Sequence, residues 1–273
     1  MKKIDLAQDR AADFSARIKR DAAQIRNDFI VAPAASQPPA MTQLLRGGRG
    51  GGVVKLKVLL SMLWVAVAQP YDVTEPARVW AELIGLDDPE SRGAARVNAA
   101  IRRLTEDKFL RVERQPGLPS RVFLMNETGN GDEYTKPSDY WGPGGVVGDL
   151  PRERYQYTSV PSDLWLNGWI SGMSGPALAM YLAVLQQSNL KNGEPGRTGF
   201  YFAPNVAARR YGLTDVTRGK GLHELQDLGL IDIERKVIGR QALGNIRARN
   251  TYTVDMGRLR QKPSDSAFAT LRR

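Results

Sequence analysis

The 273-residue chain contains no cysteine and only one histidine, His223. Without cysteine there are no disulfide bonds and no metal sites built from thiolates. One histidine is too few for a rolling-circle relaxase of the two-histidine metal type or for a typical tyrosine recombinase. A P-loop is also lacking, because six residues separate Gly212 from Gly219 and Gly221 stands where that motif requires serine or threonine. We therefore expect a protein that is not an enzyme, with no catalytic residues, no cofactor and no bound metal.

Long hydrophobic runs are lacking as well. The longest, Val58 to Ala68, is interrupted by Ser61 and is far shorter than the ~20 residues of a membrane-spanning helix. No apolar segment follows Lys2 and Lys3, as one would in a secretory signal. We expect a cytoplasmic, nucleoid-associated protein with no membrane partner.

One acidic cluster resembles a catalytic motif. Asp232, Glu234 and Lys236 have the residue types of a metal-dependent nuclease. They alternate along a predicted strand, however, and the counterpart of Glu234 in an earlier strand, Glu113, is not followed by lysine. A strand stabilised by a salt bridge is the favoured interpretation.

The charge of the chain favours a polyanionic partner. The formal net charge is +10, while the apolar and charged fractions, 42% and 25%, are typical of a soluble globular protein. Much of the excess positive charge lies near the two ends of the chain. Because a basic protein releases the counterions of a polyanion on binding, nucleic acid is the partner that charge suggests.

A pattern that occurs twice gives this suggestion a structural form. Residues Ile101–Arg114 align without a gap on Leu222–Arg235, and each copy reads as a helix end, a short polar turn and a strand. Upstream of each copy, a shorter helix closes at Gly-Leu-x-Asp, starting at Gly85 and at Gly212. Helix, glycine turn, second helix and hairpin is the order of a winged helix-turn-helix, whose second helix enters a DNA groove.

We expect a mainly α fold with small β-hairpins (α+β), consisting of two winged helix-turn-helix domains and an N-terminal helix. The predicted parts are an N-terminal helix with a Gly/Pro-rich linker (1–53), a first winged-helix domain (54–126), an interdomain connection (127–156), a second winged-helix domain (157–256) and a basic C-terminal tail (257–273).

The N-terminal segment has an apolar stripe at seven-residue spacing, formed by Ile4, Ala11, Ile18 and Ile25. Such a stripe on a helix must be buried, either in a dimer interface or against its own domain. Since neither predicted domain obviously covers it, the stripe predicts a homodimer or a site-assembled oligomer through residues 4–30.

The candidate DNA-binding residues are basic and polar side chains of the predicted recognition helices and the second wing. We expect Arg218 to read a base edge and the wing arginines to bind the DNA backbone or the minor groove. The full set is Arg92, Arg96 and Arg103 in the first helix, Thr217, Arg218, Lys220 and His223 in the second helix, and Lys236, Arg240, Arg247 and Arg249 in the second wing.

Residues 157–255 resemble the winged-helix module of plasmid replication initiators and related bacterial regulators. The matching positions are Tyr157, Val160-Pro161, Leu164, Ser174-Gly-Pro-Ala177, Tyr181-Leu182, Gly199-Phe-Tyr-Phe202, Gly212-Leu213, Thr217, Gly221-Leu222, Leu225 and Gly229-Leu230-Ile231. The module also occurs earlier in the chain, at 55–126, and two copies in one chain are similar to the tandem layout of initiators that bind repeated origin sites. The recognition helix of this first module is about six residues longer. The resemblance implies a winged-helix fold and binding to duplex DNA.

Three functions are consistent with these observations. The first is a sequence-specific double-stranded DNA-binding protein, interpreted as a transcriptional regulator. The second is a plasmid or phage replication initiator that binds repeated origin sites. The third is a winged-helix scaffold for protein contacts, as in the accessory subunits of bacterial condensins. Those subunits tend to be acidic, whereas arginines lie on both predicted recognition helices here.

Overall fold

The computed structural model describes residues 3–32, 37–46, 51–114, 116–141, 156–190, 201–202, 204–240, 246–264 and 267–268. Within these ranges helices predominate, and the strands form small antiparallel sheets. The predicted α+β class is therefore confirmed. Parts of the predicted linker, connection and tail (33–36, 47–50, 142–155, 265–266 and 269–273) lie outside the described residues.

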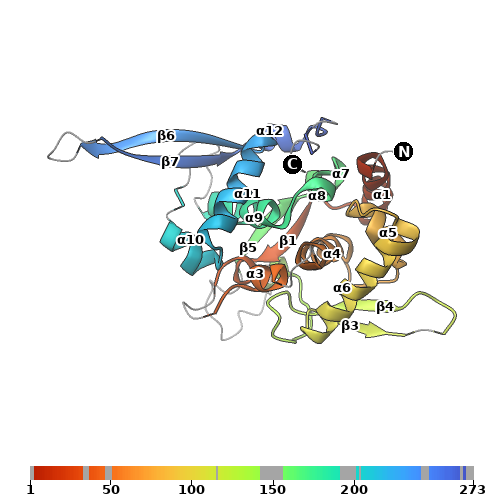
Figure 1. Cartoon of the computed structure of the whole chain (residues 1–273). Helices are drawn as coiled ribbons and strands as arrows, with labels where there is room; N and C mark the ends of the chain where they lie inside the picture. Colours follow the sequence, from red (N-terminus) through yellow and green to blue (C-terminus); the bar gives the residue numbers. More distant parts are fainter. Residues whose placement is uncertain are drawn as a thin grey trace.

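The first module, residues 51–124, begins with an apolar helix and ends with a β-hairpin (Figure 1). Its elements in chain order are α4 (Gly51–Val65), β2 (Asp72–Val73), α5 (Ala77–Leu83), the π-helix η1 (Pro89–Gly93), α6 (Ala94–Glu106), β3 (Leu110–Glu113) and β4 (Arg121–Leu124). β4 lies between β2 and β3 in one sheet. The three helices and the hairpin agree with the prediction, whereas β2 is too short to leave an alternating pattern in the sequence.

The second module, residues 157–254, begins with a strand and two short helices, and it ends, like the first, with helices followed by a hairpin, which is longer here. Its elements are β5 (Tyr157–Pro161), α7 (Asp163–Leu166), α8 (Trp169–Gly172), α9 (Gly175–Leu190), α10 (Pro204–Tyr211), α11 (Asp215–Asp227), β6 (Ile231–Arg240) and β7 (Ile246–Val254), and the short α12 (Met256–Leu259) follows. Figure 1 shows β6 and β7 as a ribbon that projects from the body on the side opposite to the β3–β4 hairpin.

The repeated sequence pattern corresponds to a repeated backbone geometry. Lys108 and Gly229, which align in the two copies, both have positive φ angles of 63° and 70°. In each copy the next residue closes the turn, because the Phe109 amide donates to the Leu104 carbonyl and the Leu230 amide donates to the Leu225 carbonyl. The same turn therefore joins α6 to β3 and α11 to β6.

The predicted N-terminal helix is shorter than expected, and its apolar stripe is covered within the chain. Helix α1 (Lys3–Ile18) ends where Lys19 adopts a φ of 46°, and the chain continues as β1 (Ala22–Arg26) and α2 (Asn27–Ile30). Ile25 therefore belongs to a strand, which pairs with β5. Ala11 and Phe14 of α1 are fully buried, and Phe14 stacks on Trp80 of α5 at 5.4 Å. The expectation that neither module covers the stripe is wrong, because helix periodicity does not show which element packs against it.

Part of the predicted linker is also folded. Helix α3 (Ala40–Leu45) buries Met41 and Leu44, so residues 40–45 do not form a tether. Gly51 and Gly52 belong to the first turn of α4, and a Cβ on Gly52 would lie only 2.8 Å from the Cα of Leu45. Gly52 allows α3 and α4 to approach closely, whereas glycine composition alone suggests flexibility.

The two modules share one hydrophobic core. The ring of Trp64 in α4 stacks on the ring of Trp165 in α7 at 4.8 Å. Each indole nitrogen donates to a serine of the opposite segment, Trp64 to Ser162 and Trp165 to Ser61, both at 3.0 Å. The buried apolar residues of both modules belong to one continuous cluster. The modules are therefore repeated in sequence but joined in packing.

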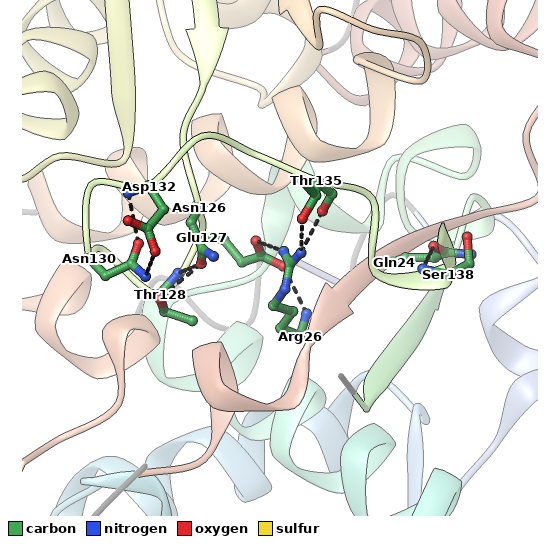
Figure 2. A network of polar contacts seen from close by, with 9 residues as sticks. All are labelled: Gln24, Arg26, Asn126, Glu127, Thr128, Asn130, Asp132, Thr135 and Ser138. Carbon is green, nitrogen blue, oxygen red and sulfur yellow. Dashed lines mark hydrogen bonds and ion pairs between the residues drawn. The ribbon is translucent and has the colours of Figure 1, made fainter. Parts of the chain in front are cut away.

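The start of the predicted interdomain connection is fastened to the N-terminal strand. Figure 2 shows Arg26 of β1 pointing towards Glu127 and Thr135. The Arg26 guanidinium donates to the Glu127 carboxylate at 2.6 Å and to the Thr135 carbonyl at 2.6 Å, and both charged side chains are buried. The amide of Ser138, in the 3-10 helix η2 (Pro137–Trp141), donates to the side chain of Gln24 at 3.1 Å. This part of the connection is a packed element of the fold.

Candidate nucleic-acid interface

Helix α6 presents basic side chains on the surface opposite to the core. Val97 and Leu104, one heptad apart, are fully buried. Arg96 and Arg103 of α6 are exposed, as is Arg92 in the preceding η1. An amphipathic helix of this kind buries its apolar stripe and leaves its cations available to a partner.

The three arginines differ in how they are held. Asp88 caps the start of η1 and binds the Nε of Arg92 at 3.2 Å. Arg103 forms an ion pair with Glu106 at 2.7 Å. Within the described part of the chain, the Arg96 guanidinium has no hydrogen-bond or ion-pair partner. Arg96 is therefore the candidate on this helix whose charge is least compensated.

A cleft of about 570 Å³ lies between the first turns of α4 and the flank of α6 that carries Arg96 and Arg103. We call it the α4–α6 cleft. Its charged lining residues are Arg46, Lys55, Arg96, Arg103 and Asp107. Neither Arg46 nor Lys55 is among the predicted DNA-binding residues, because Arg46 lies in the predicted linker and Lys55 in a mainly apolar helix.

The opposite flank of α6 faces the β3–β4 hairpin. A second cleft of about 760 Å³ separates the two, and Asn98, Arg102 and Thr105 of α6 line it together with Val112 and Leu118 of the hairpin. Helix α6 is thus bordered by the hairpin on one side and by the α4–α6 cleft on the other.

Helix α11 begins with a capped turn that holds two of the candidate residues. The Thr214 hydroxyl accepts a hydrogen bond from the Thr217 amide at 3.2 Å, which satisfies one free amide of the helix start. Arg218 donates to the Asp215 carboxylate at 3.0 and 2.6 Å, and its side chain is only 16% exposed. Arg218 is therefore held against its own helix, and the more exposed cation of this turn is Lys220.

Two further exposed side chains lie on α11. His223 is exposed, and its Nδ1 lies 2.9 Å from the Asp227 carboxylate. Val216, in the first turn, is 66% exposed although it is apolar. Val216 is not among the predicted DNA-binding residues, because its position on the outer surface depends on where the helix begins.

The β6–β7 ribbon brings some of the candidate cations of the second wing together. Lys236 and Arg249 are directly opposite each other across the two strands. The Arg249 guanidinium lies over the ring of Tyr201 at 4.5 Å. The backbones of Arg240 and Arg247 are in the two strands near the turn, and their side chains lie outside the described residues.

Two of the three residues of the nuclease-like cluster, Glu234 and Lys236, form an ion pair. Lys236 lies 3.3 Å from the Glu234 carboxylate, as the salt-bridge interpretation predicts. Among the described residues, no group of histidine, aspartate and glutamate side chains is arranged to hold a metal ion.

A buried lysine lies where the two modules meet. Lys57 of α4 donates to the Ser171 carbonyl of α8 at 3.1 Å. The pKa of Lys57 is lowered to about 7, chiefly by burial and also by the positive charge of Arg96, while the nearby Glu224 partly opposes this shift. Glu224, in α11, in turn accepts a hydrogen bond from the Ser174 amide at the start of α9 at 2.8 Å. Lys57 therefore lies within electrostatic reach of both Arg96 on α6 and Glu224 on α11.

Comparisons of the chain with protein-family models, with curated proteins and with solved structures found no match. Among the described residues, no helix is both long and apolar enough to cross a bilayer.

Proposed function

We propose that the chain is a sequence-specific double-stranded DNA-binding protein with two winged-helix modules. The first module has the element order of that fold, with three helices, a short strand after the first helix and a terminal hairpin. Its sheet order, β2-β4-β3, places the last strand in the centre. The second module shares the three helices and the hairpin.

The observation that best supports this proposal is the equivalent placement of α6 and α11. The same turn, with Lys108 or Gly229 in the left-handed region, joins each helix to a hairpin. Each helix leaves cations on its outer surface, with Arg96 exposed on α6 and Lys220 exposed on α11. A basic helix next to a hairpin is the surface that a winged helix inserts into the major groove.

The geometry changes the roles of the candidate residues in the second module. Because Arg218 is bonded to Asp215, it positions the helix start in the free protein. Lys220 and Val216 are the exposed groups of that turn, and Val216 is suited to the methyl group of thymine. Lys236 and Arg249 of the ribbon are suited to backbone phosphates.

The biological role that we propose is transcriptional regulation. The alternative role, initiation of plasmid or phage replication at repeated origin sites, is favoured by the presence of two modules in one chain. A protein-contact scaffold is the third proposal, and the net charge of +10 favours it less than DNA binding.

A homodimer on DNA remains a prediction, although not through the apolar stripe. Ala11, Phe14 and Ile25 have no exposed surface, since they are packed within the chain. A dimer through residues 4–30 would therefore need the polar face of α1. Light scattering of the full-length chain, alone and bound to DNA, measures its oligomeric state.

Selection of binding sites from a pool of random duplexes tests the proposed function. We expect one enriched motif, and the selected duplex should bind at least about a thousandfold more tightly than a scrambled duplex. The equilibrium constant should fall steeply with salt. The Lys220→Gln variant should bind the motif less tightly, whereas Lys19→Gln, a matched change outside both modules, should not. Absence of an enriched motif, or equal binding of acidic proteins and DNA, contradicts the proposal.

A further inference from the structure

The α4–α6 cleft gathers four cations, of which Arg103 is paired with Glu106, outside the cleft lining, at 2.7 Å. Four of its five charged lining residues are cations, and Asp107 is the one carboxylate among its lining residues. Asp107 reaches only Lys55, at 4.0 Å. In the described part of the chain, the guanidinium groups of Arg46 and Arg96 have no partner.

The size and walls of the cleft suit a phosphate ester better than a small free anion. Its volume of about 570 Å³ lies within the range of small-molecule sites and exceeds the space that one phosphate needs. Val54, Ala99 and Ala100 add apolar walls between the cations. Guanidinium groups bind phosphate oxygens with paired hydrogen bonds, and a partly dry wall strengthens such contacts.

The position of the cleft connects it to the recognition helix. Arg96 and Arg103 lie on the flank of α6 that faces away from the β3–β4 hairpin, whereas Asn98 and Arg102 lie on the hairpin flank. A helix in the major groove has a phosphate backbone on either side, since the groove is only about 12 Å wide. The flank with the cleft would therefore meet one backbone, while the hairpin flank meets the other.

We propose that the α4–α6 cleft is a phosphate-ester site, which seats one backbone phosphate of duplex DNA and its sugar when α6 occupies the major groove. This assignment rests on the proposed DNA-binding function. A free phosphorylated small molecule presents the same chemistry, and the experiment separates the two sources. Arg46 and Lys55, which belong to no predicted DNA-binding element, bind the ligand together with Arg96 and Arg103.

The test compares the variants Arg46→Gln and Arg96→Gln with Arg17→Gln, which removes one exposed charge from α1. Arg46 and Arg96 are exposed, so both variants should keep the melting temperature of the parent chain. Binding to the selected duplex and to a scrambled duplex is measured by fluorescence anisotropy over a series of salt concentrations. We expect each cleft variant to bind both duplexes more weakly, by a similar factor. It should also reduce the slope of log K against log salt by about 0.9, the value for one phosphate contact. Arg17→Gln should leave the slope unchanged.

A second measurement locates the phosphate. Methylphosphonate, which is uncharged, replaces one phosphate at a time across the site. At one position the replacement should lower the affinity of the parent chain for the duplex about tenfold, but it should leave the affinity of the Arg96→Gln variant nearly unchanged. In the other arm, inorganic phosphate and deoxynucleoside monophosphates are titrated against the free protein by ³¹P NMR, with sulfate as the competitor.

The outcomes distinguish this inference from the proposed function. If duplex binding is specific but the salt slope and the methylphosphonate profile are the same in both cleft variants and the parent, the cleft assignment is overturned and the function stands. If no duplex binds but a monophosphate binds saturably and is lost in Arg96→Gln, the cleft stands with a free ligand and the DNA-binding function fails. If neither DNA nor a monophosphate binds through these arginines, both are overturned.

Discussion

Single residues decide how closely the helices of this chain approach each other. A Cβ on Gly221 of α11 would lie 2.7 Å from the Cγ of Met180 in α9, too close for a normal contact. The aligned position in the first module is Ala100, which packs at the equivalent place on α6. Gly219, two residues before Gly221 in the same helix, has open space around it. The same residue type therefore has opposite effects at two positions of one helix.

Alanine substitutions at these two glycines should change the free energy of unfolding in opposite directions. Gly221→Ala should destabilise the fold by roughly 1–3 kcal/mol, because the added methyl group forces α11 away from α9. Gly219→Ala should stabilise it by roughly 0.5–1 kcal/mol, because alanine loses less backbone entropy in a helix. Urea unfolding followed by circular dichroism measures both, and equal effects of the two substitutions would contradict the close packing of α11 on α9.

Lys57 predicts a pH dependence of stability. Its pKa is about 7 in the folded chain and about 10.4 when unfolded, because burial disfavours the charged ammonium group. Between these values the unfolded chain binds more protons, so this residue makes stability rise with pH. Below pH 7 it is charged in both states, and its full destabilising effect is present.

Replacing Lys57 with methionine should remove this dependence. We expect the free energy of unfolding to rise by on the order of 3 kcal/mol at pH 6. This gain should shrink as pH rises from 7 and vanish near 10.5. The measurement is the difference in unfolding free energy between variant and parent at several pH values, which cancels the other titrating groups. A difference that does not change with pH would show that Lys57 is not desolvated.

At the scale of elements, helices and hairpins follow the sequence patterns, whereas the connecting segments do not. The stretch after β4 has the glycines and polar residues of a loop, but Glu127 is fully buried against Arg26 of β1. Asn126 and Thr128 stabilise the turn next to it, with 2.9 Å between their side chains (Figure 2). A buried ion pair thus holds together two segments that are far apart in sequence.

Breaking this ion pair should destabilise the fold. Glu127→Gln leaves the Arg26 guanidinium buried without a full countercharge, and we expect the free energy of unfolding to fall by roughly 3–5 kcal/mol. The double variant Arg26→Met, Glu127→Leu removes both charges and should recover much of that loss. Thermal unfolding of the single and double variants tests this prediction. Equal destabilisation in the two would mean that shape, and not charge pairing, matters at this position.

For the whole molecule, the common core makes the chain one folding unit. Helix α1 covers α5 and α7, and β1 completes a sheet with β5 of the second module. The stacked Trp64 and Trp165 join α4 to α7. The relative position of α6 and α11 is therefore fixed by buried contacts, so the spacing of the two proposed recognition helices is a property of the core.

Removal of residues 1–52 should unfold or strongly destabilise the chain. The deletion takes Phe14, Phe29 and Met41 out of the core and leaves β5 without its partner strand. We expect the full-length chain to unfold in one transition, seen at the same temperature by tryptophan fluorescence and by circular dichroism. The truncated chain should melt at least about 10 °C lower or fail to fold. Two separate transitions in the full chain would show that the modules are independent.

Local sequence patterns were sufficient to specify the repeated parts of this protein. The three-residue spacing of Ile101 and Leu104, repeated at Leu222 and Leu225, specifies two helices of the same kind. The turn residues that follow specify their hairpins. These features depend on neighbours within about ten positions, and local periodicity and turn chemistry are visible in any sequence.

Only the tertiary structure decided what these elements pack against and which charges remain free. Side chains far apart in sequence, such as Phe14 and Trp80 or Arg46 and Arg96, are brought together by burial of apolar surface, which has no direction and leaves no local pattern. For the same reason the sequence suggested a dimer stripe where the chain covers its own helix. Whether an arginine is bonded, as Arg218 is to Asp215, or unpaired, as Arg96 is among the described residues, likewise depends on geometry that composition does not contain.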